Sequence, residues 1–166
     1  MILGMSTSTF TLLHVLISLI GIGSGLVALY GLLNGKLLSG WTPLFLVSTV
    51  LTSVTGFLFP FEHLLPAHKV GIISLIVLAI AIAALYLFHL AGRWRAIYVI
   101  SAFMALYLNC FVAVVQMFLR IPALHAMAPN GNEPAFLVAQ TLVLLVFIVL
   151  GVFATKRFRG VPALAT

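Results

Sequence analysis

Five long apolar segments follow one another along the chain, at about residues 10–33, 41–59, 68–90, 94–119 and 134–155. Each has the roughly 20 residues that a helix needs to cross the hydrocarbon core of a bilayer, where an unpaired backbone amide costs several kcal/mol. Of the 166 residues, 64% are hydrophobic and 6% are charged, whereas about 25% of an ordinary soluble domain is charged. The sequence therefore predicts an all-α, polytopic transmembrane bundle of five helices, which forms a single domain over residues 1–166.

The charged residues divide between the two ends of the predicted spans. Six basic residues fall at one end: Lys36, Arg93, Arg95, Lys156, Arg157 and Arg159. The other end carries two basic residues and both acidic residues of the chain: Lys69, Arg120, Glu62 and Glu133. Because Lys and Arg are retained on the cytoplasmic side, this division predicts an N-terminus outside and a cytoplasmic C-terminus. We therefore interpret the net charge of +6 as an orientation signal, and we expect no nucleic-acid partner.

Four of the five histidines also fall at the predicted outer end: His14, His63, His68 and His125. His14 lies about one turn inside the first span, where a titratable ring needs a partner and is a functional candidate by default. His68 opens the third span at nearly the same depth, although a residue in that position also serves to cap a helix. His63 and His125 fall in short polar loops, where a solvated histidine is the common outcome.

One face of the fourth span carries small and polar residues over the whole membrane depth. At about 100° per residue, seven of them share one third of the helix circumference: Tyr98, Ser101, Ala105, Asn109, Ala113, Gln116 and Arg120. Such residues usually let membrane helices pack closely. Asn109 falls near mid-membrane, where an unpaired amide is costly to bury, so packing and a functional contact are equally good interpretations of it.

A pocket at the outer end would take its lining from several spans. Gln116 is one turn from the outer end of the fourth span, and Gln140 is two turns into the fifth. The predicted cofactor-binding residues are His14, His68, Asn109, Gln116, Arg120 and Gln140. A quinone or another small amphiphile would be held there by hydrogen bonds from His and Gln.

A b-type haem is the first candidate for this pocket, because two imidazoles from different helices ligate its iron within apolar walls, and an arginine pairs with a propionate. His14 and His68 are the pair at most nearly equal depth. The alternative is a divalent metal ion (copper, zinc or iron), since imidazole and carboxylate together suit these metals. Its predicted ligands are His14, Glu62, His63, His68 and His125. The spacing of Glu62, His63 and His68 matches no strong metal motif.

Several stretches of the sequence resemble one group of proteins. In one-letter code they read HLAGRWRAIYV at 89–99, ALYLNCFVAVVQ at 105–116 and APNGNEPAF at 128–136, with TSVTGF at 52–57 and PAH at 66–68. They resemble a group of small uncharacterised bacterial integral membrane proteins, and the likeness covers roughly residues 41–159. The resemblance implies a bacterial inner-membrane setting and carries no mechanism.

The leading hypothesis for function is a small membrane bundle whose outer pocket binds a redox cofactor or metal, for electron transfer or oxidase assembly. A subunit of a homo-oligomeric transporter or channel is the main alternative, since a second copy would turn the stripe on the fourth span into a pathway. A third interpretation is a non-catalytic partner of a larger membrane complex. The sequence offers no Ser-His-Asp set with plausible geometry, no phosphate-binding loop and no dinucleotide fingerprint.

Overall fold

The computed structural model describes residues 2, 4–60 and 66–159 of the chain. The helices in these ranges are α1 (Thr7–Leu33), α2 (Trp41–Gly56), α3 (Pro66–Ile82), α4 (Trp94–Arg120), α5 (Pro122–Met127) and α6 (Pro134–Arg157). A π-helical turn, η1 (Ala83–Leu87), continues α3. The prediction of an all-helical chain is thus confirmed for the described residues.

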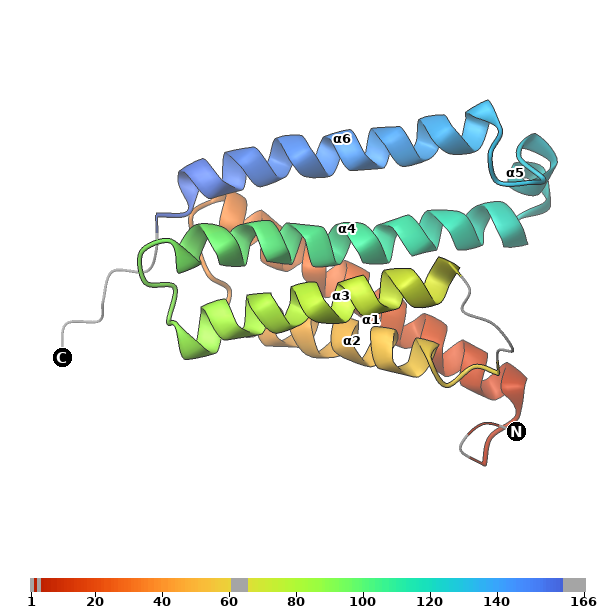
Figure 1. Cartoon of the computed structure of the whole chain (residues 1–166), viewed down its shortest axis with the longest axis horizontal. Coiled ribbons are helices and arrows are strands. Elements are labelled where there is room, and N and C mark those ends of the chain that lie inside the picture. Colours follow the sequence, from red (N-terminus) through yellow and green to blue (C-terminus); the bar gives the residue numbers. More distant parts are fainter. Residues whose placement is uncertain (1, 3, 61–65, 160–166) are drawn as a thin grey trace.

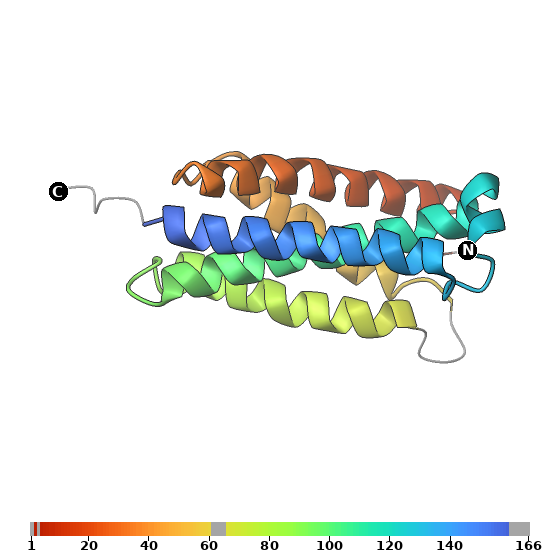
Figure 2. The same ribbon diagram turned by 90° about the horizontal axis from the view of Figure 1, so that it is seen from above.

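The longer helices run up and down along one axis, and the start of α1 and the end of α6 lie at opposite ends of the bundle (Figure 1). Helix α4 is the centre of the packing, because it contacts all five of the other helices. Half of its most apolar 18 residues are buried, against 6% in α6. Helix α6 packs along α4 and α1 and leaves the rest of its surface uncovered (Figure 2).

Four helical segments are long and apolar enough to cross a membrane: Thr7–Leu33, Ala67–Leu87, Trp94–Arg120 and Pro134–Arg157. Large apolar side chains stay exposed along them, including Leu12 on α1, Ile76 on α3 and Leu142 on α6. This surface is consistent with contact to lipid, because hydrocarbon takes the place of water around such side chains. The chain therefore has the features of a multi-pass membrane protein.

Helix α2 is shorter than the sequence predicts. It has 16 residues and ends at Gly56 instead of continuing to Phe59. At 1.5 Å per residue it is about 24 Å long, less than the roughly 30 Å of a bilayer core. The early end is explained by Gly56, which lowers helix propensity, and by Pro60, which disfavours helical backbone at the residue before it.

The short helix α5 is also absent from the prediction, which assigns Pro122 only the role of ending the fourth span. Ile121 is extended, and Pro122 then opens α5, because its fixed φ suits the first turn of a helix. Pro134 opens α6 in the same way, after Glu133 at the N-cap. One end of the bundle thus gains an additional covering segment between α4 and α6 (Figure 1).

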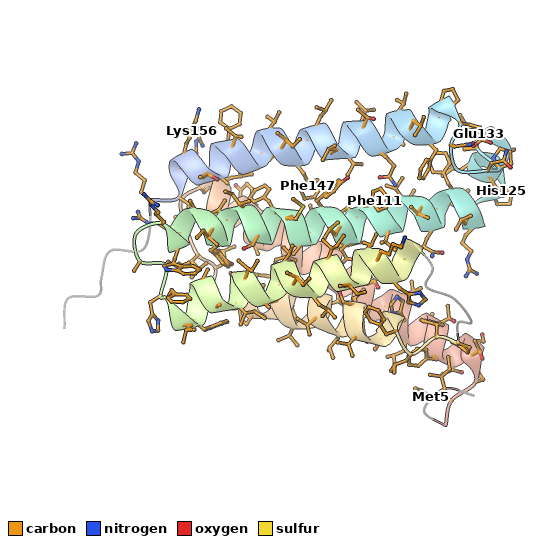
Figure 3. The ribbon with its side chains drawn as sticks, viewed as in Figure 1. Met5, Phe111, His125, Glu133, Phe147 and Lys156 are labelled. Atoms are coloured by element: carbon orange, nitrogen blue, oxygen red, sulfur yellow. The ribbon has the colours of Figure 1, made fainter. Side chains whose placement is uncertain are left out.

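The two ends of the bundle differ in their residues. Met5, His125 and Glu133 lie at one end and Lys156 at the other (Figure 3). We call the first the histidine end; the start of α1, the end of α2 and the start of α3 lie there too. We call the second the basic end, and its basic residues are Lys36, Arg93, Arg95, Lys156, Arg157 and Arg159.

The apolar core lies in the half of the bundle nearer the basic end. Its fully buried members come from several helices and include Leu32, Phe45, Leu78, Tyr98, Val99 and Leu106. At this end the rings of Phe88 and Trp94 are stacked, with centroids 3.7 Å apart and planes 2° apart. This stack closes the loop between η1 and α4, where His89 and Leu90 have positive φ values.

Candidate functional site

His14 is the best-positioned of the predicted site residues. Its half-buried ring places Nδ1 2.8 Å from Oγ1 of Thr55 on α2. The Thr55 hydroxyl donates its single proton to the carbonyl of Leu51 at 2.7 Å, so it accepts a hydrogen bond from the ring. We therefore assign the proton of the neutral ring to Nδ1, which leaves a lone pair on Nε2. A metal-ligating histidine is oriented by this kind of hydrogen bond to its other ring nitrogen.

The His14 ring packs against the end of α2. It meets the edge of the Phe59 ring, with centroids 5.3 Å apart, and Phe59 in turn contacts Phe10 at 5.1 Å. On the other side, a Cβ atom on Gly56 would lie 3.7 Å from Cε1 of His14, an ordinary contact distance. The residues around the ring are thus apolar or small, apart from the hydroxyl that orients it.

His68 is also buried, with only 6% of its surface exposed. Its ring lies 5.6 Å from that of Phe57, and the Phe57 ring covers Gly71 one turn further along α3, 3.1 Å from the position of a Cβ there. Helices α1 and α3 run along opposite edges of the bundle, and α2 packs against both (Figure 2). The two histidines therefore reach the end of α2 from different sides and contact different phenylalanines.

Other predicted site residues at the histidine end do not join a pocket. The side chains of Gln116, Arg120 and His125 are exposed. Among residues 2, 4–60 and 66–159, no group of three or more His, Cys, Asp or Glu is placed to hold a metal ion. Glu62 and His63 lie outside the described residues.

Asn109 is 8% exposed and faces α1 and α2 in the middle of the bundle. A Cβ atom on Gly21 would lie 3.1 Å from Asn109 Nδ2, 3.2 Å from Thr49 Oγ1 and 3.3 Å from Ser48 Oγ. The glycine thus lets α1 approach three polar side-chain atoms closely. Within the described part of the chain, Asn109 Nδ2 has no hydrogen-bond partner.

The hydroxyls near Asn109 already use their protons. Thr49 donates to the carbonyl of Phe45 at 2.8 Å, and Ser48 donates to that of Leu44 at 2.6 Å. Because a hydroxyl has one proton, what these two side chains can offer Asn109 is a lone pair. Nδ2 of Asn109 is a donor and could use such a lone pair. The amide thus faces acceptors on α2 but forms no hydrogen bond with them.

Gln140 links α6 to α4 instead of facing the histidines. Its Nε2 donates to the backbone carbonyl of Phe111 at 3.1 Å. Its Oε1 is buried, and among the described residues it has no hydrogen-bond partner. Since the single bond that it makes joins two helices, the side chain fits the common packing role of polar residues in membrane proteins.

Glu133 organises the loop before α6. One carboxylate oxygen accepts from the backbone N of Asn130 at 3.0 Å and from its Nδ2 at 2.8 Å, and the other accepts from the backbone N of Asn132 at 3.0 Å. Desolvation is the largest single influence and raises the pKa of Glu133, but the hydrogen bonds together outweigh it and hold the pKa below its ordinary value. The carboxylate is thus accounted for by the loop itself.

Thr55 is the important residue that sequence reasoning missed. It belongs to the quoted stretch at 52–57, but a threonine near the end of an apolar helix looks like a packing residue. Only the contact between α1 and α2 shows that it faces His14.

Comparison with models of protein families, with curated proteins and with solved structures found no match to this chain.

Proposed function

We propose that this chain is a multi-pass protein of the bacterial cytoplasmic membrane, with a redox cofactor or metal ion bound at its histidine end. A b-type haem is the first candidate, and the role is electron transfer or oxidase assembly. His14 is the ligand that the geometry favours, and His68 is the proposed second ligand. The hydrogen bond between Nδ1 of His14 and Oγ1 of Thr55 is the observation that carries the proposal, because the tautomer that we assign from it leaves the lone pair on Nε2.

This arrangement favours a metal centre over a quinone. A quinone carbonyl needs a hydrogen-bond donor, whereas Nε2 of His14 is an acceptor when the proton is on Nδ1. A metal ion needs the lone pair. When bound, haem iron would supply one-electron chemistry; this chain's residues would bind it through His14, orient that ring through Thr55 and exclude water with Phe10 and Phe59.

In the proposed topology the histidine end faces outward and the basic end faces the cytoplasm, with five membrane crossings. The division of basic residues supports this orientation. Helix α2 would complete its crossing with the help of the residues that flank it. A reporter enzyme that requires the cytoplasm should be active when fused to the C-terminus; activity restricted to a reporter that requires the periplasm would contradict the orientation.

The test of the cofactor is an absorbance spectrum of protein purified from bacteria supplied with haem, together with elemental analysis for iron, copper and zinc. We expect a Soret band that His14→Ala abolishes and that Thr55→Val weakens or shifts, because the ring then loses its orienting partner. His125→Ala is the matched control on an exposed histidine and should leave the band unchanged. Protein with neither a Soret band nor stoichiometric metal would refute the proposal.

The alternative functions receive less support. A pathway along the stripe on α4 would require it to face a second copy, but Tyr98, Ser101, Ala105 and Asn109 are buried within the single chain. Phe45 and Leu106 are fully buried beside that face, so large apolar side chains fill the space that a pore would need. Few residues of α6 are buried, and its exposed surface suits contact with a partner protein and contact with lipid equally well.

A further inference from the structure

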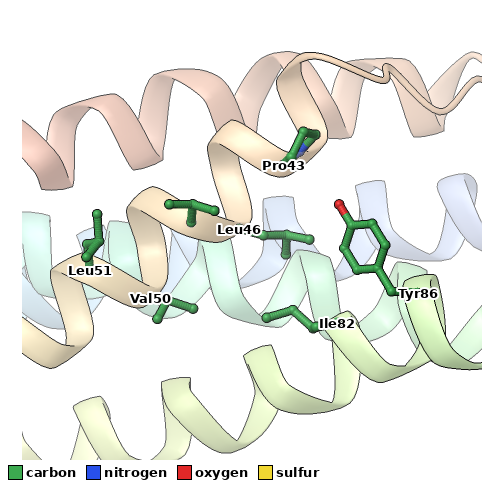
Figure 4. Close-up of a pocket in the computed structure, with 7 residues that line it drawn as sticks. Pro43, Leu46, Val50, Leu51, Ile82 and Tyr86 are labelled. Carbon is green, nitrogen blue, oxygen red and sulfur yellow. The ribbon is translucent and has the colours of Figure 1, made fainter.

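An apolar groove opens on the side of the bundle between α2 and the segment formed by α3 and η1. Its volume is about 330 Å³, at the lower end of the range for ligand pockets. Five residues of α2, from Pro43 to Leu51, form one wall, and Ile82 and Tyr86 form the other (Figure 4). The Tyr86 hydroxyl is the one polar side-chain group in this lining.

The groove exists because α2 and α3 separate toward the basic end. Near the histidine end they are joined by the hydroxyls of Ser53 and Ser74, which lie 3.1 Å apart. Toward Pro43 and Tyr86 the two helices diverge (Figure 4). There the backbone of the second wall widens into a π-helical turn, closed by the hydrogen bond from Phe88 N to Ala83 O at 2.9 Å. Such turns are rare and are frequent at functional sites.

We propose that this groove binds one acyl chain of an anionic phospholipid, with the headgroup at the basic end. The groove faces outward, since Val47 is 58% and Tyr86 is 53% exposed, and in a bilayer the medium on that side is lipid. A helix of a partner protein is about 10–12 Å in diameter with its side chains, so a groove of this volume cannot enclose one. A methylene chain fits, because it has no polar group that the apolar lining would leave unpaired.

Basic residues on the segments next to both walls of the groove favour an anionic headgroup. The loop that leads into α2 carries Lys36, and the segment that follows η1 carries Arg93 and Arg95. Glu133, the acidic residue within the described part of the chain, lies at the opposite end of the bundle (Figure 3). A basic surface beside the membrane attracts anionic lipids, and the Tyr86 hydroxyl can donate to a phosphate or ester oxygen.

This inference does not rest on the proposed cofactor, because neither His14 nor His68 lines the groove. The test is native mass spectrometry of the full chain in mild detergent, titrated with phosphatidylglycerol or phosphatidylcholine of identical acyl chains. We expect one lipid to be retained per protein, with phosphatidylglycerol preferred about tenfold or more, given two or three basic residues near the headgroup. Equal retention of the two lipids would overturn the proposal.

Two pairs of variants separate the acyl chain from the headgroup. Val47→Trp fills the groove and should abolish retention, whereas Val146→Trp, on a residue of α6 that is 53% exposed and outside the groove, should not. Changing both Arg93 and Arg95 to Gln should reduce the preference for phosphatidylglycerol, whereas Lys69→Gln at the histidine end should preserve it. Retention by Val47→Trp equal to that of Val146→Trp would overturn the proposal, as would a retained quinone in place of phospholipid.

Discussion

The two halves of the bundle are held together by different kinds of contact. In the half nearer the basic end, helices meet mainly through large side chains such as Phe45, Tyr98 and Leu106, which are almost entirely buried; the Tyr98 hydroxyl also hydrogen-bonds the side chain of Thr42. Toward the histidine end, aromatic contacts such as Phe118 with Phe136 are joined by more polar ones. The polar contacts are His14 with Thr55, Ser53 with Ser74, Gln140 with the Phe111 carbonyl, and, in the middle of the bundle, Asn109 beside Gly21.

The difference matters because helices in a bilayer gain little from the hydrophobic effect, since lipid tails are as apolar as leucine. The basic half therefore depends on close van der Waals packing. The histidine half depends on hydrogen bonds worth roughly 0.6–2 kcal/mol each, and in its described residues two buried amide atoms lack partners. A half that is packed mainly by large side chains thus adjoins a half in which Asn109 Nδ2 and Gln140 Oε1 lack a hydrogen-bond partner among the described residues.

Shortening a buried side chain in the half nearer the basic end should have the largest effect on stability. Leu106 is fully buried, so Leu106→Ala leaves a cavity and should lower the free energy of unfolding by about 2–5 kcal/mol. The measurement is thermal unfolding in detergent, followed by the fluorescence of Trp41 and Trp94. Leu142→Ala is the control, because Leu142 is 58% exposed on α6; equal losses in the two variants would mean that the packed half is no more stabilising than the lipid-facing surface.

Adding one methyl group to the same half should have the next largest effect. A Cβ atom on Gly25 would lie 2.7 Å from Leu106 Cδ1 and 2.8 Å from Phe45 Cδ2, and both side chains are fully buried with little room to move. Gly25→Ala should therefore destabilise the protein by about 1–3 kcal/mol through overpacking.

The matched control for that variant is Gly23→Ala on the same helix, since a Cβ atom there meets nothing within 4 Å. It should leave the unfolding temperature unchanged or raise it, because alanine favours helix. If Gly25→Ala were as well tolerated as Gly23→Ala, the packing between α1, α2 and α4 would be looser than the distances indicate.

The sequence predicts the helices better than the contacts between them. Apolar length alone indicates the segments that become α1, α3, α4 and α6, because it is a property of each segment by itself. The shorter α2 and the extra α5 were missed, since Gly56 and Pro122 act through local backbone preferences that an apolar run conceals.

Site prediction depends on relations between helices, which periodicity does not contain. The position of His14 within the first apolar segment could be read from the sequence, but its partner Thr55 depends on how α1 packs against α2. The stripe predicted on α4 divides in the structure: Asn109 is buried, whereas Gln116 and Arg120 are exposed. Which part of a helical face is covered depends on where the neighbouring helices end.

A substitution of Asn109 tests whether its Nδ2 atom is unpaired. Leucine has nearly the shape of asparagine without the buried donor, so Asn109→Leu should raise the free energy of unfolding by about 1 kcal/mol, as the desolvation cost of Nδ2 is removed. The readout is again the fluorescence of Trp41 and Trp94 during heating. A lower unfolding temperature would show that Asn109 forms a stabilising hydrogen bond, with Thr49 or with a bound molecule.

The smallest effect should come from Glu133, which lies at the surface of the histidine end. Hydrogen bonds from Asn130 and Asn132 hold the pKa of Glu133 below its ordinary value. The charged carboxylate therefore stabilises the folded chain at pH values above the ordinary pKa of a glutamate. The contribution is lost as the pH falls through the lower folded pKa. Glu133 is also the N-cap residue of α6, where a negative charge is favourable, so Glu133→Gln should lower the unfolding temperature slightly at neutral pH.

In acid, wild type and Glu133→Gln should converge, because the protonated carboxyl group and the amide are then both neutral. Unfolding temperatures of the two proteins, measured at a series of pH values from neutral downward, give the difference directly. A difference that stays constant over this range would show that the loop is held by hydrogen bonds independent of charge. A difference that grows in acid would contradict the assigned sign, since the charged form would then be the one that the folded chain disfavours.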